Sequence, residues 1–338
     1  MLRKKCLLFS AATLAAVAIL LLLPAKGVKS TREVASLPER TNLLCVGLDA
    51  AAGNTDVLML VSFDRTAKEI SVLQIPRDTY FASNTAQSKI NQLYPHYRIG
   101  GKGERDALSA LSAELSAALG VRVDGYMAAD LSLVSLFVDE IGGVTVEVPA
   151  PIRHLASDGE GYIEIPAGEC LLFGREAVEF LRFRAGYIEG DLGRVDAQKL
   201  LLASMYRKVR DDVKLPLLLS LAPKLYGRMK TDLSLATVLA ILRDYYSAKG
   251  AYTVRLSTLP GEATRASLQG GLSYYAANRK AAGELLARYF GGDGFDKGGR
   301  FLYEGKPHFE NIYYDENMAY TVFTDDTLNE LDIKTKKK

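Results

Sequence analysis

The sequence predicts an α/β fold, in a single domain that follows a membrane-spanning N-terminus. Short, nearly continuous apolar runs are typical of strands covered on both faces, and between them leucines recur every three or four residues, as on the buried side of helices. Strands and helices alternate over residues 41–290, which favours one α/β domain over two. A content of 48% hydrophobic and 24% charged residues excludes collagen-like, coiled-coil and fully disordered chains.

The N-terminus has the pattern of a membrane anchor. Residues 1–5 carry three positive charges, and residues 6–23 contain no charge. A helix of that length spans about 27 Å, close to the ~30 Å hydrocarbon core of a bilayer. Because positive flanks stay in the cytoplasm, we expect the rest of the chain outside, with residues 24–40 as a tether. A cleaved signal peptide is the alternative, but Leu23 is a poor residue for the −3 position of a cleavage site.

Charge, cysteine and histidine content exclude further classes. Five of the 42 basic residues lie within residues 1–29, which contain no acid, so the remainder has 37 basic and 40 acidic residues. This slight excess of acidic residues after residue 29 argues against general nucleic-acid binding, which needs a basic surface. Three cysteines are too few for a disulfide framework; Cys45 lies in an apolar run and is expected as a buried thiol, with a bond to Cys170 as the weaker alternative. The three histidines are not spaced as metal-ligand pairs.

The elements of the domain follow from apolar periodicity and from glycine and proline. Strands are expected at residues 42–48, 56–63, 70–75, 144–148 and 252–258. Helices are expected at residues 106–119, 131–141, 174–181, 195–209, 215–225, 233–245 and 277–289. Residues 152–169 are expected as a glycine-bearing loop, and residues 291–338 as a C-terminal appendix that is partly ordered at best.

Candidate functional residues lie at the ends of these elements, because the familiar catalytic motifs are absent. The sequence has no phosphate loop, no nucleophile elbow, no H-E-x-x-H and no C-x-x-C. Open α/β sheets bind ligands beyond the ends of their strands. The candidates at element ends are Asp56, Arg77, Asp78, Lys89, Arg182, Arg184, Arg194 and Gln198.

Spacing favours a phosphate site for the basic members of this set. If residues 181–184 are extended, Arg182 and Arg184 share one face, and Arg194 and Gln198 share a helix face four residues apart. Arginines gathered so closely repel one another unless an anion lies between them. The paired N–H groups of each guanidinium match the oxygens of a di- or polyphosphate. Asp56 could then hold Mg²⁺ against the phosphates. The alternative is that Arg182 and Arg184 form ion pairs with Glu176, Glu179 or Asp191 on a solvated surface, and that Lys89 is an ordinary surface lysine.

The order of the motifs resembles the LytR-CpsA-Psr family. The matching segments are NLLCVGLD (42–49), TDVLML (55–60), IPRDTY (75–80), KIN (89–91), DEIGGV (139–144), LRFR (181–184) and GDLGR (190–194) with Gln198. The resemblance covers roughly residues 40–290. It implies a central mixed β-sheet flanked by helices and a hydrophobic pocket for a polyprenyl tail; the apolar helix 131–141 could line that pocket, although ordinary core packing is the stronger interpretation.

The resemblance also implies a function. Family members are membrane-anchored, extracytoplasmic phosphotransferases that move a glycopolymer, such as teichoic acid or capsule, from undecaprenyl pyrophosphate to peptidoglycan. By motif position, the pyrophosphate would be held by Arg77, Lys89, Arg182, Arg184, Arg194 and Gln198. Asp56 and, as a less certain second ligand, Asp49 would hold Mg²⁺ or Mn²⁺. Many relatives have Arg-Ser-Asp where this chain has Asn54-Thr55-Asp56, so one contact is missing or rerouted.

Asp78 is a candidate for the base that takes the acceptor proton, with Arg77 as its catalytic neighbour, but Asp78 could equally be the ion-pair partner of Arg77.

The sequence leaves two other functions open. A binding protein that recognises polyprenyl-phosphate glycans without turnover would need the same cluster. A lipid pyrophosphatase would use water as the acceptor and would release the phosphorylated glycan. In every case the expected partners are the lipid-linked glycopolymer, the membrane and peptidoglycan, with no nucleic acid.

Overall fold

The computed structural model describes residues 38–48, 55–156, 159, 161–248, 251–266, 271–301, 309–310, 318–324, 326–328 and 331–336. The predicted anchor, most of the tether, Asp49 and Asn54 lie outside these residues. In the described part of the chain, no helix is both long enough and apolar enough to cross a bilayer. The anchor at residues 6–23 therefore stays a prediction.

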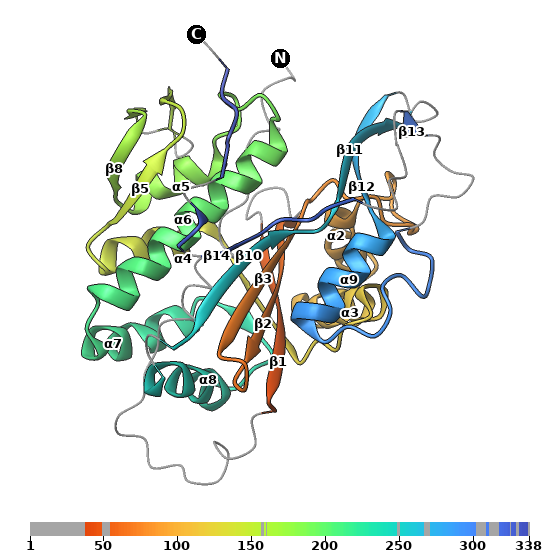
Figure 1. Cartoon of the computed structure of the whole chain (residues 1–338), viewed down its shortest axis with the longest axis horizontal. Helices are drawn as coiled ribbons and strands as arrows, with labels where there is room; N and C mark the ends of the chain where they lie inside the picture. The colour runs from red at the N-terminus through yellow and green to blue at the C-terminus, as the bar shows by residue number, and fades with distance from the viewer. Residues whose placement is uncertain are drawn as a thin grey trace.

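Within the described residues, a mixed sheet of seven strands forms the centre of the molecule, in the order β14-β10-β3-β2-β1-β4-β9 (Figure 1). The strands are β1 (Arg40–Leu48), β2 (Thr55–Asp64), β3 (Glu69–Ile75), β4 (Gly125–Ala129), β9 (Lys230–Thr231), β10 (Thr253–Thr258) and β14 (Val322–Thr324). Strands β1 to β3 form an antiparallel meander, and β4 and β10 lie parallel to β1 and β3. The α/β class and the central mixed sheet agree with the expected fold.

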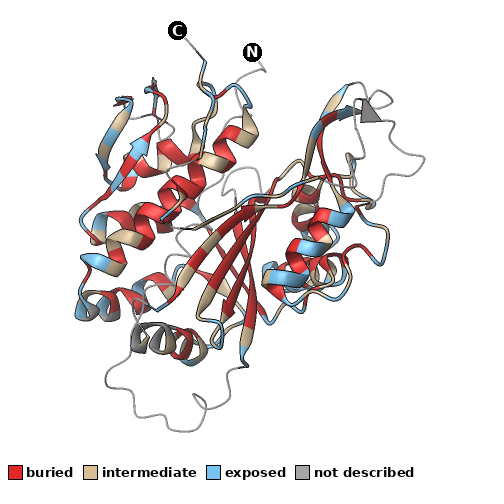
Figure 2. Ribbon diagram, viewed as in Figure 1, coloured by how far each residue is buried: buried red, intermediate tan, exposed pale blue. Residues whose placement is uncertain are grey.

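Side-chain alternation along the strands builds an apolar layer on each face of the sheet. In β1, Leu43 and Cys45 face one layer, whereas Leu44 and Val46 face the other. The first layer contains α4 (Leu131–Glu140), α5 (Gly174–Arg182), α6 (Asp191–Asp211), α7 (Leu215–Tyr226) and α8 (Leu235–Ser247). The second contains α2 (Leu93–Ile99), α3 (Glu104–Leu119) and α9 (Arg279–Phe290). Because helices cover both faces, the central strands are buried along most of their length, as Figure 2 shows.

The expected helices are present, with ends shifted by up to four residues. The largest shift is at α6, which begins at Asp191 rather than at residue 195. Gly190 precedes it with a positive φ of 56°, a conformation that glycine adopts without strain. This early start places Asp191 in the first turn of the helix, three residues before Arg194.

The loop expected at residues 152–169 was a wrong prediction. The segment contains the hairpin of β6 (Ile152–Leu155) and β7 (Tyr162–Ile165), and β8 (Gly168–Leu172) pairs with β5 (Val144–Val148). In β7, Ile163 and Ile165 are buried while their neighbours are exposed. Alternation over four residues is too short to predict a strand, and the glycines around it favoured a loop.

A smaller sheet, in the order β12-β11-β13, was also missed by the sequence analysis. It contains β11 (Gly261–Ala266), β12 (Leu272–Ala277) and β13 (Phe309–Glu310). The helix expected from residue 277 begins only at Arg279, because Asn278 caps it by accepting the N–H of Ala281. Residues 291–338, expected as an appendix, contribute β14 to the central sheet and Phe295 and Phe301 to the second apolar layer.

The cysteines behave as the sequence indicated. Cys45 is fully buried in the first apolar layer, and burial raises the pKa of its thiol far above the ordinary value. Cys170 is also a free thiol, so the alternative of a Cys45–Cys170 bond is wrong.

Candidate functional site

The candidate site lies where β2 begins and β3 ends. These two strands are antiparallel, with Leu58 opposite Ile75, so the start of β2 lies beside the chain that leaves β3. Asp56 is the second residue of β2, and Arg77 follows β3 directly after Pro76. Nη1 of Arg77 donates to Oδ1 of Asp56 at 2.9 Å. The antiparallel meander thus joins two candidates that lie 21 residues apart in the chain.

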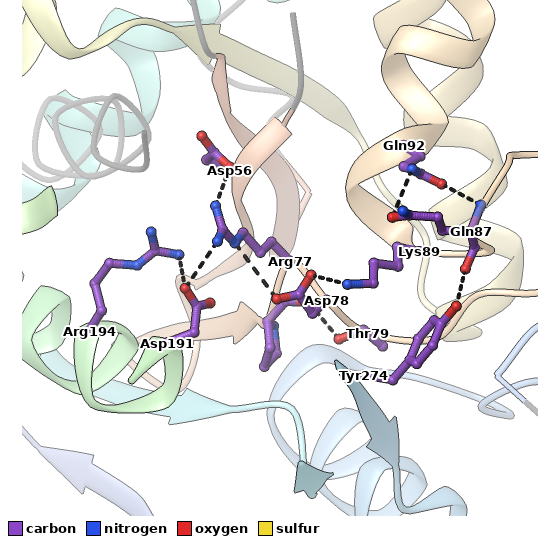
Figure 3. Close-up of polar contacts among 11 residues, drawn as sticks. Asp56, Arg77, Asp78, Thr79, Gln87, Lys89, Gln92, Asp191, Arg194 and Tyr274 are labelled. Carbon is purple, nitrogen blue, oxygen red and sulfur yellow. Dashed lines mark hydrogen bonds and ion pairs between the residues drawn. The ribbon is translucent and has the colours of Figure 1, made fainter. Parts of the chain in front are cut away.

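Arg77 is the centre of a network of carboxylates (Figure 3). In addition to Asp56, its guanidinium lies 3.4 Å from Asp191 Oδ1 and 3.9 Å from Asp78 Oδ2. Burial alone would lower the pKa of Arg77, but the charges of Asp191, Asp56 and Asp78 outweigh burial and raise it. Arg77 is therefore held in its charged form by acids from three different segments.

Asp191 links Arg77 to a second arginine. Nη2 of Arg194 lies 2.6 Å from the same Asp191 Oδ1, one turn along α6. Arg194 is only 3% exposed, and burial lowers its pKa, an effect that Asp191 opposes and the charge of Arg77 reinforces. A buried arginine of this kind has already lost its hydration, so it interacts strongly with any anion that reaches it.

Asp78 and Lys89 form the adjoining part of the network (Figure 3). Nζ of Lys89 donates to Asp78 Oδ1 at 2.8 Å, and the ammonium lies 5.1 Å from the centre of the Tyr274 ring. Tyr274 is itself fixed, because its hydroxyl donates to the carbonyl of Gln87 at 2.7 Å. Because the Lys89 side chain is only 11% exposed, its interpretation as an ordinary surface lysine is wrong. Asp78 lies between Lys89 and Arg77, closer to the lysine.

Arg182, Arg184 and Gln198 lie next to this network with different partners. Arg182 is the last residue of α5 and lies 3.6 Å from Glu179 on the same helix. The charge of Arg184 contributes to the lowered pKa of Arg194, which places it near that side chain. Gln198 accepts from Nε2 of Gln74 at 3.3 Å and donates to the carbonyl of Leu181 at 3.4 Å. Gln198 thereby connects α6 to β3 and to the end of α5.

Residues 24–290 match the model of the LytR_cpsA_psr family. The chain belongs to the LytR-CpsA-Psr family. Among curated relatives, it is 26% identical over 219 residues to the polyisoprenyl-teichoic acid–peptidoglycan teichoic acid transferase TagU of Oceanobacillus iheyensis. It is 28% identical over 196 residues to the transferase TagV of Bacillus subtilis, which has the same descriptive name. These matches cover 64% and 57% of this chain, and only 66% and 48% of the two relatives.

Solved structures share the LytR-CpsA-Psr fold. The crystal structure of B. subtilis TagV has a TM-score of 0.61 at 22% identity and covers 76% of this chain and 100% of that one. The structure of TagT bound to LIIa-WTA has a TM-score of 0.57 at 21% identity, with 80% and 99% covered. At these identities the likeness establishes the fold.

One geometric expectation for this LytR-CpsA-Psr site was wrong. Residues 181–184 are not extended: Leu181 and Arg182 end α5, and the extended backbone begins at Phe183. The helix continues because Ala177, Phe180 and Leu181 all face the apolar layer. Arg182 and Arg184 therefore do not share a strand face.

The alternative of ion pairs on a solvated surface is correct for one partner of Arg182 and wrong in its setting. Glu179 lies 3.6 Å from Arg182. However, Glu179 is only 2% exposed, so this pair does not lie on a solvated surface. Charges removed from water require partners at all times, and the partner can be a protein carboxylate or a ligand.

The sequence analysis missed three residues that contribute to this candidate site. Asp191 was treated only as an alternative partner, yet it joins Arg77 to Arg194. Gln74, a buried polar residue of β3, binds Gln198. Tyr274 supports Lys89 from the missed strand β12. A signal existed for the first two, since an acid one turn before an arginine and a glutamine in a buried strand both call for a partner.

Proposed function

We propose that this chain is a phosphotransferase, anchored by residues 6–23 with its domain outside the cytoplasmic membrane. It would move a glycopolymer from undecaprenyl pyrophosphate to peptidoglycan through a phosphodiester. The observation that carries the proposal is the network in which Arg77, Lys89 and Arg194, from distant parts of the sequence, share carboxylates at one end of the sheet. The names of the relatives TagU and TagV support teichoic acid as the class of glycopolymer.

The network is suited to a diphosphate. Arginine forks bind phosphate oxygens through paired N–H groups, and lysine adds a point charge. The first turn of α6, which carries Asp191, adds backbone N–H donors and the positive end of the helix dipole. Asp56 and Asp191 contact the same guanidiniums that a diphosphate would use. Binding would therefore exchange carboxylate partners for phosphate oxygens, without leaving a buried charge uncompensated.

We propose Mg²⁺, or Mn²⁺, as the cofactor. Mg²⁺ is typically held by one or two carboxylates together with substrate phosphates. Asp56 supplies a buried carboxylate beside Arg77, and Asp49 lies outside the described residues. No group of three or more His, Cys, Asp or Glu side chains among the described residues could hold a metal unaided, which fits a site completed by the substrate. When bound, the cation would supply positive charge at the phosphate oxygens.

The transfer itself needs few protein groups. A hydroxyl of the acceptor forms a bond to the sugar-linked phosphorus, while the bond from that phosphorus to undecaprenyl phosphate breaks. Arg77 and Arg194 would stabilise the charge that develops on the phosphate oxygens. We assign the hydroxyl proton to Asp78, whose carboxylate Lys89 and Arg77 hold in a defined position.

The test uses the full-length protein in lipid nanodiscs with Mg²⁺, an undecaprenyl-pyrophosphate oligosaccharide and peptidoglycan fragments. Mass spectrometry should detect the oligosaccharide joined to peptidoglycan through one phosphate, together with undecaprenyl phosphate. Glycan phosphate released without attachment would indicate a pyrophosphatase. Lipid binding without turnover would indicate a binding protein. Either result would contradict the proposal.

A second arm of this experiment tests the cofactor. Excess EDTA should abolish transfer and leave part of the lipid binding intact, because the arginines remain. Asp56→Asn should raise the Mg²⁺ concentration needed for half-maximal transfer. Full transfer in excess EDTA would remove Asp56 from its proposed role.

A further inference from the structure

A cavity of about 320 Å³ opens beside the candidate site, between α6, the turn that follows β10 and the C-terminal segment before β14. The wall formed by α6 consists of Leu192, Val195, Asp196 and Lys199. Their spacing of three, four and seven residues places them on one face of the helix. The volume lies at the lower end of the range usual for small-ligand sites.

This cavity adjoins the arginine network through α6 and through the backbone of Asp78. Asp191 lies on the neighbouring face of the first turn of α6, since each residue advances by about 100° around a helix, and Arg194 lies farther round, toward the opposite face. On the other side, the backbone N–H of Tyr275, a lining residue, donates to the carbonyl of Asp78 at 3.0 Å. The carbonyl of Tyr275 accepts from the N–H of Tyr80 at 2.8 Å. The cavity therefore adjoins the helix turn that carries Asp191 and the backbone of Asp78, the proposed base.

The lining suits a ligand rich in hydroxyl groups and poor in negative charge. Among the charged lining residues, buried Lys199 is paired with Asp196 at 2.8 Å, so their charges compensate each other. The exposed carboxylate of Glu189 then gives the lining a net negative charge. Carboxylates accept hydrogen bonds from hydroxyls and repel phosphates. The rings of Tyr275, Tyr320 and Phe323 supply rigid apolar surface. This chemistry fits a sugar ring and disfavours a stretch of a phosphate-containing polymer.

The outer wall is formed by residues that follow the family match. Residues 318–321, Phe323 and Leu331 line the cavity, whereas the LytR_cpsA_psr match ends at residue 290. The wall is fixed in place because Val322 and Phe323 pair with β10, as Figure 1 shows at the edge of the central sheet. The cavity thus combines the helix of the arginine network with a wall that belongs to this chain rather than to the family pattern.

We infer that this cavity binds a sugar ring of the peptidoglycan acceptor. The inference rests on the proposed function. In-line displacement at phosphorus puts the attacking and leaving oxygens on opposite sides, so the acceptor needs a surface next to, but separate from, the diphosphate ligands. The cavity meets that requirement, and its negative charge favours an acceptor sugar without phosphate over a phosphate-containing donor polymer. The acceptor hydroxyl would enter beside Asp78, which takes its proton as the new P–O bond forms.

The test narrows the mouth of the cavity at an exposed residue, where the fold tolerates a larger side chain. Ala319→Trp places a ring at the outer wall, and Ala117→Trp, at an exposed site on α3 across the sheet, is the matched control. The full-length protein in nanodiscs is titrated with a phosphate-free tetrasaccharide of N-acetylglucosamine and N-acetylmuramic acid, and separately with undecaprenyl pyrophosphate. We expect Ala319→Trp to weaken tetrasaccharide binding at least tenfold and to leave undecaprenyl pyrophosphate binding unchanged. The control should alter neither.

Glu189→Gln provides a second variant that changes no volume. It should weaken tetrasaccharide binding severalfold, because a carboxylate acceptor becomes an amide. Equal tetrasaccharide binding by the wild type, Ala319→Trp and Glu189→Gln would overturn the inference. Loss of affinity in Ala319→Trp for a complete glycan-linked donor, but not for the tetrasaccharide, would assign the cavity to the donor sugar and also overturn it. If the wild type binds the tetrasaccharide in this cavity but transfers nothing, the proposed function fails and the sugar site stands.

Discussion

Charged side chains are paired differently at the two ends of strands β2 and β3. At one end, Asp64 pairs with Arg40 at 2.6 Å, Glu69 pairs with Arg255 at 2.5 Å, and Asp244 lies near both Arg65 and Lys68, all with partly exposed side chains. At the other end, the guanidinium of Arg77 is shared among several carboxylates, and Asp191 is shared in turn with buried Arg194. Partly exposed pairs contribute little to stability, whereas the proposed diphosphate site depends on a buried network that can exchange a protein partner for a ligand.

The largest expected effect is on the rate of transfer, which should depend on Arg194 at one end and hardly at all on Arg255 at the other. Arg194→Met should lower transfer by a factor of about 10² or more, since it removes a donor to the developing phosphate charge. Arg255→Met, the same change at the other end, should leave transfer within about twofold, because a partly exposed ion pair contributes about 0–1 kcal/mol and lies away from the chemistry. Initial rates of linked-product formation measure both. Equal losses in the two variants would remove the distinction between the ends.

The next effect concerns stability. Asp191→Asn leaves Arg77 and Arg194 close together with less compensating charge, and should lower the free energy of unfolding by about 2 kcal/mol. Inorganic pyrophosphate should restore part of this loss, because it can replace the missing carboxylate. Glu69→Gln should cost about 0.5 kcal/mol and show no response to pyrophosphate. Chemical denaturation with and without pyrophosphate measures the difference. No recovery in Asp191→Asn would contradict exchange of partners.

The smallest effect is a pH dependence of stability at the end of β2 that carries Asp64. Although burial would raise the pKa of Asp64, the N–H of Ala67 and the side chain of Arg40 lower it overall. A lowered folded-state pKa means that the stabilisation is present above the unfolded value of about 3.9 and is lost as pH falls through the folded value. Asp64→Asn should therefore reduce stability at pH 6, and the reduction should become smaller as pH falls toward 3. A constant difference between the two pH values would show that the charge of Asp64 is unimportant.

Much of this site could be predicted from local sequence. Asp56 at the start of one strand and Pro76-Arg77-Asp78 at the end of the next lie close together because consecutive strands pair as an antiparallel meander, which is a short-range event. Arg194 and Gln198 share a helix face as expected, in α6. These residues needed only strand order and helical periodicity.

Other features depend on tertiary packing. The segment at Arg182 fits either a strand or a helix end, and contacts of Phe180 and Leu181 with the apolar layer decide for the helix. Tyr274 reaches Lys89 only through a strand that short, mixed sequence did not reveal. The sharing of Asp191 between Arg77 and Arg194 joins residues more than a hundred positions apart, which no local pattern specifies.

The most direct test of the central claim, that one arginine network binds a diphosphate, compares two lipids. The full-length protein in nanodiscs, as the wild type and as Arg77→Lys, is titrated with undecaprenyl pyrophosphate and with undecaprenyl phosphate. Arg77→Lys keeps the positive charge and removes the paired N–H groups of the guanidinium. We predict that the wild type binds the pyrophosphate at least tenfold more tightly and that Arg77→Lys loses most of this preference. Equal affinity of the wild type for the two lipids would contradict the account.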